Sequence, residues 1–145
     1  IKAGRDIGKD MSNYRVMVAA PAYTGPTNKN LEKVKWFPAM VGNHVADIVE
    51  KYGKDTDEVP KSLTAYIEKR RGYDYSKHGQ SDNPYLDFIT DDVVESFCVL
   101  GEPEAHVEKL KVLENNGATQ FNIYLDNGDE EKIIADYGEN IIPHF

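Results

Sequence analysis

The sequence predicts an α/β fold that corresponds to the C-terminal part of a (β/α)₈ TIM barrel. Apolar runs typical of strands, at 97–101 and 119–125, alternate with amphipathic stretches typical of helices. A strand, a crossover helix and a parallel strand form the repeating unit of such folds. A complete barrel takes about 250 residues, and this chain has 145, so we expect an incomplete barrel. The length also allows a small open α/β sheet.

Composition and charge exclude several classes of protein. The chain is 40% hydrophobic with a mean hydropathy of −0.59, and no apolar run is long enough to span a bilayer. A formal net charge of −8, with one short basic cluster at 68–71, argues against nucleic acid as a partner. The single Cys98 forms no internal disulfide, and no signal-peptide pattern is present, so we expect a cytoplasmic protein.

The first half of the chain begins with two clear elements. Residues 3–6 look like the end of a helix, so we expect further residues upstream. Residues 14–20 form a short apolar run closed by Pro21, which favours a buried parallel strand over a helix segment. Residues 30–52 carry apolar side chains at steps of three and four and predict a helix that stops at Gly53. We expect this helix to be kinked or split just before Pro38.

Residues 54–87 are the least regular part of the sequence. A short helix is predicted at 60–71, followed by a long polar loop that contains Gly and Pro. Loops of this kind inside a compact fold are often lids or binding loops, although a disordered insertion has the same composition. We therefore expect one domain over 1–145 with a lid-like insertion at about 54–89.

The second half carries the strongest local signals. Thr90 and the two carboxylates after it predict the start of a short helix, because the next strand candidate begins at about Phe97. Pro103 suits the first position of another helix, which ends at 116–117. The apolar stripe of that helix consists of Val107, Leu110 and Leu113.

The last strand predicts candidate ligand contacts. Its apolar residues alternate with Gln120, Asn122 and Tyr124, so in a barrel one of the two sets would face the interior. Polar side chains near the carboxyl end of a barrel strand are placed to bind a ligand. Tyr23 follows the first strand and would lie at the same end. An ordinary half-exposed strand is the alternative interpretation.

Several segments together resemble the C-terminal part of the bacterial luciferase-like flavin oxidoreductases. They are AGRD at 3–6, VLGEPE at 99–104, NGA at 116–118 and YGENIIPHF at 137–145. This family includes monooxygenases that use FMN and reductases that use the deazaflavin coenzyme F420. The resemblance implies a (β/α)₈ barrel of which roughly the first half, with much of the flavin-binding surface, is absent here. It therefore implies that this chain alone is inactive and binds neither cofactor.

The resemblance also implies roles for individual residues. Tyr23, Asn122 and Tyr124 would contact the FMN or F420. RGYDY at 71–75, followed by Lys77, resembles the lid loop that covers the flavin in bacterial luciferase. The lid or substrate contacts would then be Tyr73, Tyr75, Lys77 and His78.

An incomplete barrel has consequences for partners. If about six apolar side chains lose their cover at roughly 1.5 to 3 kcal/mol each, the loss approaches the 5 to 15 kcal/mol that stabilises a whole domain. We therefore expect a homo-oligomer, pairing with a missing N-terminal half, or rearrangement into an open sheet. A small-molecule substrate follows from the enzyme interpretation. The alternative is a non-catalytic α/β protein-interaction module that self-associates.

A metal site is not predicted. His44 and Asp47 lie three residues apart on one helical face, as a metal-ligand or acid/base pair would. His44 also lies beside the apolar stripe, where a buried or interface histidine is the simpler interpretation. No zinc-ligand spacing is present.

Overall fold

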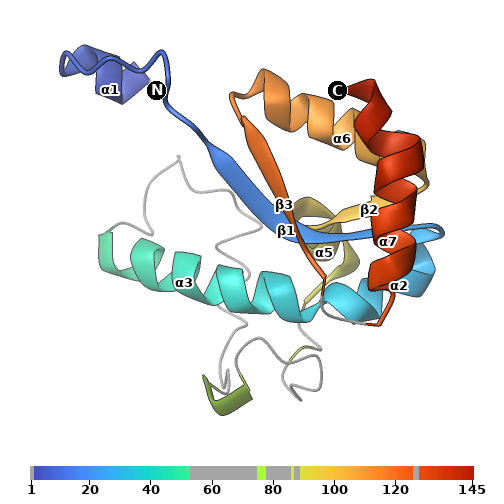
Figure 1. Cartoon of the computed structure of the whole chain (residues 1–145). Helices are drawn as coiled ribbons and strands as arrows, with labels where there is room; N and C mark the ends of the chain where they lie inside the picture. The colour runs from blue at the N-terminus through green and yellow to red at the C-terminus, as the bar shows by residue number, and fades with distance from the viewer. Residues whose placement is uncertain (1, 53–74, 78–85, 87–88, 126–127) are drawn as a thin grey trace.

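The computed structural model describes residues 2–52, 75–77, 86, 89–125 and 128–145 (Figure 1). In these residues three parallel strands form one sheet, in the order β2-β1-β3. The strands are β1 at Met17–Thr24, β2 at Val99–Gly101 and β3 at Gln120–Tyr124. The predicted α/β class, with parallel strands joined by crossover helices, is confirmed, and the sheet is not closed.

The strand order determines which edge of the sheet is open. Consecutive strands of a (β/α)₈ barrel follow one another around the cylinder, whereas here β1 lies between β2 and β3. The β1 ladder to β3 runs from the pair Met17↔Gln120 to the pair Pro21↔Tyr124. Among the described strands, β3 therefore has a neighbour on one side only. The sheet is open, and its parallel strands with crossover helices are consistent with the predicted part of a barrel.

Strand β1 lies further along the chain than its sequence pattern predicts. The predicted strand covers 14–20 and stops at Pro21, but the observed strand continues through this proline to Thr24. Proline has no backbone N–H, so it cannot donate the hydrogen bond that a strand paired on both sides needs at each position. Pairing with β2 begins only at Ala22, so Pro21 precedes that second ladder. The prediction that Pro21 ends the strand is wrong for this reason.

The predicted split before Pro38 is confirmed. Helix α2 covers Thr27–Val34 and helix α3 covers Trp36–Tyr52, with a break at Lys35. Proline is tolerated in the first turn of a helix, where its missing N–H would have no intrahelical partner. The break therefore leaves Pro38 in the first turn of α3. Helix α2 starts three residues before the predicted position at Asn30.

The predicted elements of the second half are confirmed in order. Helix α5 covers Asp91–Phe97 after Thr90, and α6 covers Pro103–Asn115. Gly117 follows α6 with a φ of 97°, the left-handed conformation expected after a helix end. The closing helix α7 covers Glu130–Asp136.

Short helical segments complete the described structure. Helix α1 covers Lys2–Asp6, and a 3₁₀ turn η1 covers Tyr75–Lys77. After α7 the chain continues in a π-helical turn η2 at Tyr137–Ile141 and a 3₁₀ turn η3 at Ile142–His144. The helix predicted at 60–71 and most of the insertion predicted at 54–89 lie outside the described residues, so that domain boundary stays a prediction.

Helices cover both faces of the sheet. In Figure 1, α3 and α6 lie on opposite sides of β1 and β3. Side chains alternate between the faces of a strand. Thr24 of β1 and Phe121 and Ile123 of β3 lie on the face packed against α6 and α7, here called the α7 face. Tyr124 lies on the other face, here called the α3 face, and contacts helix α3.

The buried core draws on both faces. It includes Tyr23, Val34, Trp36, Phe37, Val94, Val99, Val107, Ile133, Tyr137 and Ile141. None of the described helices is long and apolar enough to cross a membrane.

Candidate functional site

The carboxyl ends of β1 and β2 meet at a tight backbone contact. The Gly25 N–H donates to the Gly101 carbonyl at 2.9 Å. Gly101 has a φ of 124°, and a Cβ added there would lie 3.0 Å from the Ala105 Cβ. Only glycine fits both conditions. This edge of an α/β sheet is where ligand sites form, so the polar groups around it are the candidate functional site.

Three side chains form a hydrogen-bonded group at the end of β1. The Thr24 hydroxyl donates to the Asp136 carboxylate, and Lys132 Nζ donates both to that carboxylate and to Thr24 Oγ1, the latter at 2.8 Å. Hydrogen bonds from Lys132 and Thr24 hold the pKa of Asp136 below its usual value. Thr24 is buried, whereas Lys132 is 59% exposed. The group thus joins a buried hydroxyl to an ionised pair that reaches solvent.

A buried histidine joins three elements behind this group. His106 of α6 has no exposed surface, and its Nε2 lies 3.2 Å from the Tyr23 carbonyl. A carbonyl oxygen can only accept a hydrogen bond, so Nε2 of His106 carries the ring proton. Nδ1 then accepts a hydrogen bond from the Tyr137 hydroxyl, with 2.9 Å between the two atoms. Burial lowers the pKa of His106, opposed by hydrogen bonds to the backbone of Tyr23 and Gly101. The imidazole is therefore neutral and fully hydrogen-bonded.

A second ion pair flanks the same end of the sheet. Lys33 of α2 pairs with Asp129, which precedes α7, and its Nζ lies 5.3 Å from the centre of the Tyr23 ring. Both charged side chains are more than one-third exposed, so this pair contributes little stability. Its position matters more, because it links α2 to the start of α7 across the carboxyl end of β1.

The three predicted cofactor contacts, Tyr23, Asn122 and Tyr124, lie on the α3 face, because side chains alternate along each strand. They differ in how exposed they are to solvent. Tyr23 is 2% exposed, so its ring is enclosed by the protein in this arrangement. Tyr124 is 41% exposed and packs against Trp36 and Phe37, with ring centres 6.0 and 5.4 Å away. Asn122 is exposed, and its amide contacts Met17 Sδ at 3.0 Å. Because Tyr23 is enclosed, the three side chains do not form one contact surface for a flavin here, and their cofactor role stays a prediction.

The predicted lid contacts and the histidine pair are only partly described. Tyr73 and His78 lie outside the described residues, while Tyr75 and Lys77 lie in η1, so the lid assignment stays a prediction. His44 is exposed on α3, so of the predicted buried or interface histidine the buried form is wrong and the interface form stays a prediction. The described residues hold no group of three His, Cys, Asp or Glu side chains that could bind a metal ion.

The single cysteine is no nucleophile in this structure. Cys98 is buried, and burial raises the pKa of its thiol to about 12. Lys109 Nζ donates to the Cys98 carbonyl at 2.6 Å rather than to the sulfur. A thiol kept protonated is unreactive.

Five side chains of the site were missed at the level of sequence. They are Thr24, His106, Lys132, Asp136 and Tyr137. A signal exists for His106, which lies four residues before Leu110 and seven before Leu113, on the apolar stripe of its helix. Lys132 and Asp136 are likewise four residues apart in α7.

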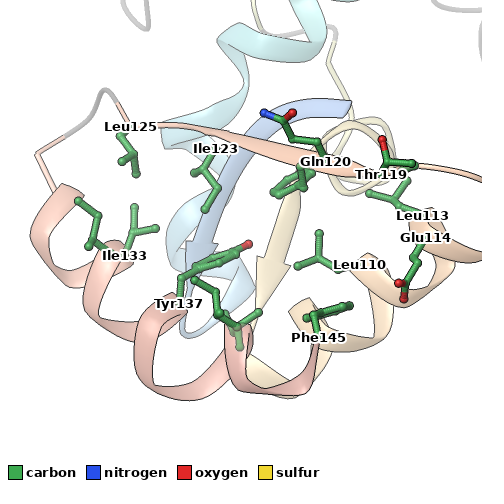
Figure 2. Close-up of a pocket in the computed structure, with 15 residues that line it drawn as sticks. Leu110, Leu113, Glu114, Thr119, Gln120, Ile123, Leu125, Ile133, Tyr137 and Phe145 are labelled. Carbon is green, nitrogen blue, oxygen red and sulfur yellow. The ribbon is translucent and has the colours of Figure 1, made fainter. Parts of the chain in front are cut away.

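An apolar groove lies beside β3 on the α7 face. It has a volume of about 500 Å³ and is lined by β3, α6, α7 and the C-terminal turns. Figure 2 shows Leu110, Ile123, Ile133, Tyr137 and Phe145 around the hollow, with Glu114, Thr119 and Gln120 at one end. Its size and apolar lining are typical of a binding groove.

Comparison with known proteins places these observations in a family. The chain is 28% identical over 121 residues to a 5,10-methylenetetrahydromethanopterin reductase of Methanopyrus kandleri, an alignment that covers 81% of this chain and 31% of the relative. The chain thus spans about a third of that protein's length. No solved structure matches the chain. The model of the luciferase-like monooxygenase family matches residues 1–120. The chain, whose parallel α/β architecture agrees with part of the barrel that the resemblance implies, belongs to this luciferase-like family.

Proposed function

We propose that this chain supplies the C-terminal strands and helices of a luciferase-like oxidoreductase that acts on a small molecule with FMN or coenzyme F420. Family membership supports the oxidoreductase class. The similarity to a protein named as a reductase supports hydride transfer over monooxygenation. When bound, the flavin or deazaflavin supplies the redox chemistry, and the protein supplies binding and orientation.

The observation that carries the proposal is the polar group at the carboxyl end of β1. Lys132, whose side chain is 59% exposed, presents an ammonium group that Asp136 and Thr24 orient through hydrogen bonds. A cation oriented at this edge of the sheet would bind a carbonyl or anionic group of a substrate or cofactor. The neutral His106 fixes α6 against β1 and so keeps the edge rigid.

The enclosed Tyr23 ring supports the expectation that the chain alone does not bind a flavin. A flavin ring stacks on open, flat surfaces, and Tyr23 offers none in this arrangement. We therefore expect cofactor binding only when a complementary polypeptide supplies the remaining strands and rearranges the α3 face. Cofactor choice between FMN and F420 belongs to that complex.

A complementation titration tests the proposal. The chain is titrated with FMN and with F420 alone, and then as a chimera behind the part of the Methanopyrus kandleri reductase that lies outside the match. We expect no fluorescence change for the chain alone and saturable binding of one cofactor by the chimera. A Lys132→Ala chimera should bind substrate or cofactor about tenfold or more weakly, against an exposed Lys2→Ala control. A chimera that unfolds cooperatively yet binds neither cofactor would contradict the proposal.

The second candidate is a non-catalytic interaction module. The apolar groove beside β3 favours it, because exposed apolar hollows of this size mark interaction sites. This candidate predicts that neither the chain nor the chimera binds FMN or F420, so the same titration separates the two functions.

A further inference from the structure

Both hydrogen-bond partners of the buried His106 are chain neighbours of the polar group at the end of β1. Nε2 of the imidazole lies 3.2 Å from the carbonyl of Tyr23, which directly precedes Thr24. Nδ1 lies 2.9 Å from the hydroxyl of Tyr137, which directly follows Asp136. Thr24 and Asp136 are the two side chains that hydrogen-bond to each other across the site. The imidazole therefore joins the same two segments as the contact between Thr24 and Asp136.

This second connection is buried and tightly packed. His106 has no exposed surface, and both of its partners are buried. The rings of His106 and Tyr137 lie edge to face, with their centres 5.5 Å apart. Close-packed interiors transmit small displacements rather than absorbing them. A shift of Tyr23 or Tyr137 is therefore passed on to the next residue of the chain, which carries a side chain of the site.

Only the neutral imidazole makes both hydrogen bonds. When a proton from solvent binds to Nδ1, this nitrogen becomes a donor and no longer accepts the hydrogen bond from the Tyr137 hydroxyl. The hydroxyl proton then needs a new acceptor, and the described residues provide no other hydrogen-bond partner for it. Nε2 keeps its proton and its hydrogen bond to the Tyr23 carbonyl. Protonation of His106 thus breaks the connection at η2 and keeps it at β1.

The surroundings of His106 determine when it binds this proton. Burial lowers the pKa of His106, and hydrogen bonds to the backbone of β1 and β2 oppose this effect. Asp136 of α7 also favours the imidazolium, whereas Lys109 of α6 disfavours it. Neither β1 nor β2 carries a charged side chain, and Glu139 of η2 is exposed. The ring is therefore neutral at neutral pH and binds a proton below the usual histidine pKa of about 6.5.

We propose that His106 is a positioning residue, which holds Thr24 and Asp136 in hydrogen-bond contact while it is neutral and releases Asp136 when it is protonated. The release passes through Tyr137, because the proton breaks the hydrogen bond of that residue. Lys132 bonds to both Thr24 and Asp136, so its ammonium group loses its orientation in the same step.

The effect on ligand binding rests on the proposed function, whereas the coupling itself is measured on side chains of the chain without a ligand. A chain that shows the coupling but whose chimera binds no cofactor would contradict the proposed function alone. A chimera that binds a cofactor without the coupling would contradict only the role of His106.

Chemical shifts followed during a pH titration of the isotope-labelled chain test the coupling. The ring nitrogens of His106 report its protonation, and the Asp136 carboxyl carbon and the Thr24 β-carbon report the contact. In the wild type, both carbon signals should show a step at the pH where His106 titrates, separate from the protonation of Asp136 itself. His106→Gln should remove this step. His144→Gln, which removes an exposed histidine of η3, is the matched control and should keep it.

Tyr137→Phe distinguishes the proposed route from a direct effect of charge. The substitution keeps the imidazole and removes a hydrogen bond that favours the neutral ring, so His106 should titrate at a higher pH. The step at Thr24 should be lost even though His106 still titrates. The Thr24 shift at neutral pH should resemble that of the wild type below the His106 titration, because the connection to η2 is already broken. Circular dichroism at each pH should show that all variants stay folded.

Three outcomes would overturn the proposal. In the first, His106 titrates in the folded chain while the signals of Thr24 and Asp136 do not respond. In the second, the step at Thr24 is as large in Tyr137→Phe as in the wild type, so that the charge of the imidazolium explains it without a change of position. In the third, His106 binds a proton only as the chain unfolds, which would limit the residue to a structural role.

Discussion

The two faces of the sheet differ in how fully helices cover the strands. A closed barrel covers its outer face with helices and fills its interior with strand side chains. Here helices α6 and α7 pack on the α7 face, where Phe121 and Ile123 of β3 are half-buried beside an apolar groove. On the α3 face, Tyr124 contacts Trp36 and Phe37, yet Asn122 and Tyr124 remain exposed. The comparison teaches that one helix covers the β1 end of the α3 face and leaves the β3 side chains of that face accessible.

Aromatic side chains provide the cover that the α3 face has. Trp36 and Phe37 are each 5% exposed and lie edge to face, with ring centres 5.6 Å apart. Rings of this size bury about 150–250 Å² each, and such pairs add about 0.5–1.5 kcal/mol beyond area. On the α7 face the β1 side chains include the small Ala20 and Ala22, which fill less space.

Trp36→Ala should have the largest effect, because it removes the cover of the α3 face. Loss of a buried tryptophan side chain costs about 3–5 kcal/mol, and urea denaturation measures it. The matched control is Phe145→Ala at the groove, where 58% exposure predicts less than about 1 kcal/mol in monomer stability. Equal losses in the two variants would contradict the difference between the faces.

His106→Gln should have the next largest effect and should change the pH dependence. Loss of the imidazole leaves the buried Tyr23 carbonyl and Tyr137 hydroxyl without this hydrogen-bond partner. Each unsatisfied group lowers the free energy of unfolding by about 1–3 kcal/mol. Burial lowers the pKa of His106, so the unfolded state binds its proton first as pH falls. Wild-type stability from this residue is complete above the unfolded pKa of about 6.5 and declines below it.

Urea midpoints at neutral and mildly acidic pH measure the histidine contribution. The wild type should lose more stability than His106→Gln over this interval. The charged neighbours Asp136 and Lys109 stay in both proteins, so the difference isolates the imidazole. Identical pH slopes would show that His106 is not held neutral.

Tyr137→Phe should cost about 1 kcal/mol, because it removes one hydroxyl that donates to a buried nitrogen. Because the substitution keeps the ring and removes only the hydroxyl, it separates the contribution of packing on the α7 face from that of the hydrogen bond. Nitrogen chemical shifts should show that His106 is the Nε2-protonated tautomer in both proteins, since Nε2 still donates a hydrogen bond to the Tyr23 carbonyl. A change of tautomer would contradict the assigned hydrogen bonds.

Lys132→Met should have the smallest effect on stability, below about 1 kcal/mol, because the side chain is 59% exposed. It should raise the pKa of Asp136, whose largest lowering comes from the Lys132 hydrogen bond. Carboxyl chemical shifts followed during a pH titration measure this, with Lys2→Met beside Asp6 as the exposed control. An unchanged Asp136 pKa would mean that Lys132 does not hold the carboxylate.

Local signals explain which elements the sequence predicted well. Pro103 and the glycine at 117 bound α6 because a proline fits the first helical turn and a glycine fits the left-handed turn after the last. The alternation in β3 appears as alternating burial along Gln120–Tyr124. The site was predicted less well, because Thr24, His106 and Asp136 meet only after β1, α6 and α7 pack together.

By itself, the sequence determined the α/β class, the order of strands and helices, and the pairs of side chains that share a strand face. These properties depend on periodicity and on proline and glycine geometry, which act over a few residues. Tertiary structure decided that β1 lies at the centre, that α3 packs against Tyr124, and that the apolar groove lies beside β3. The reason is that strand neighbours and face coverage depend on which distant apolar surfaces bury each other, a choice that no short window of sequence contains.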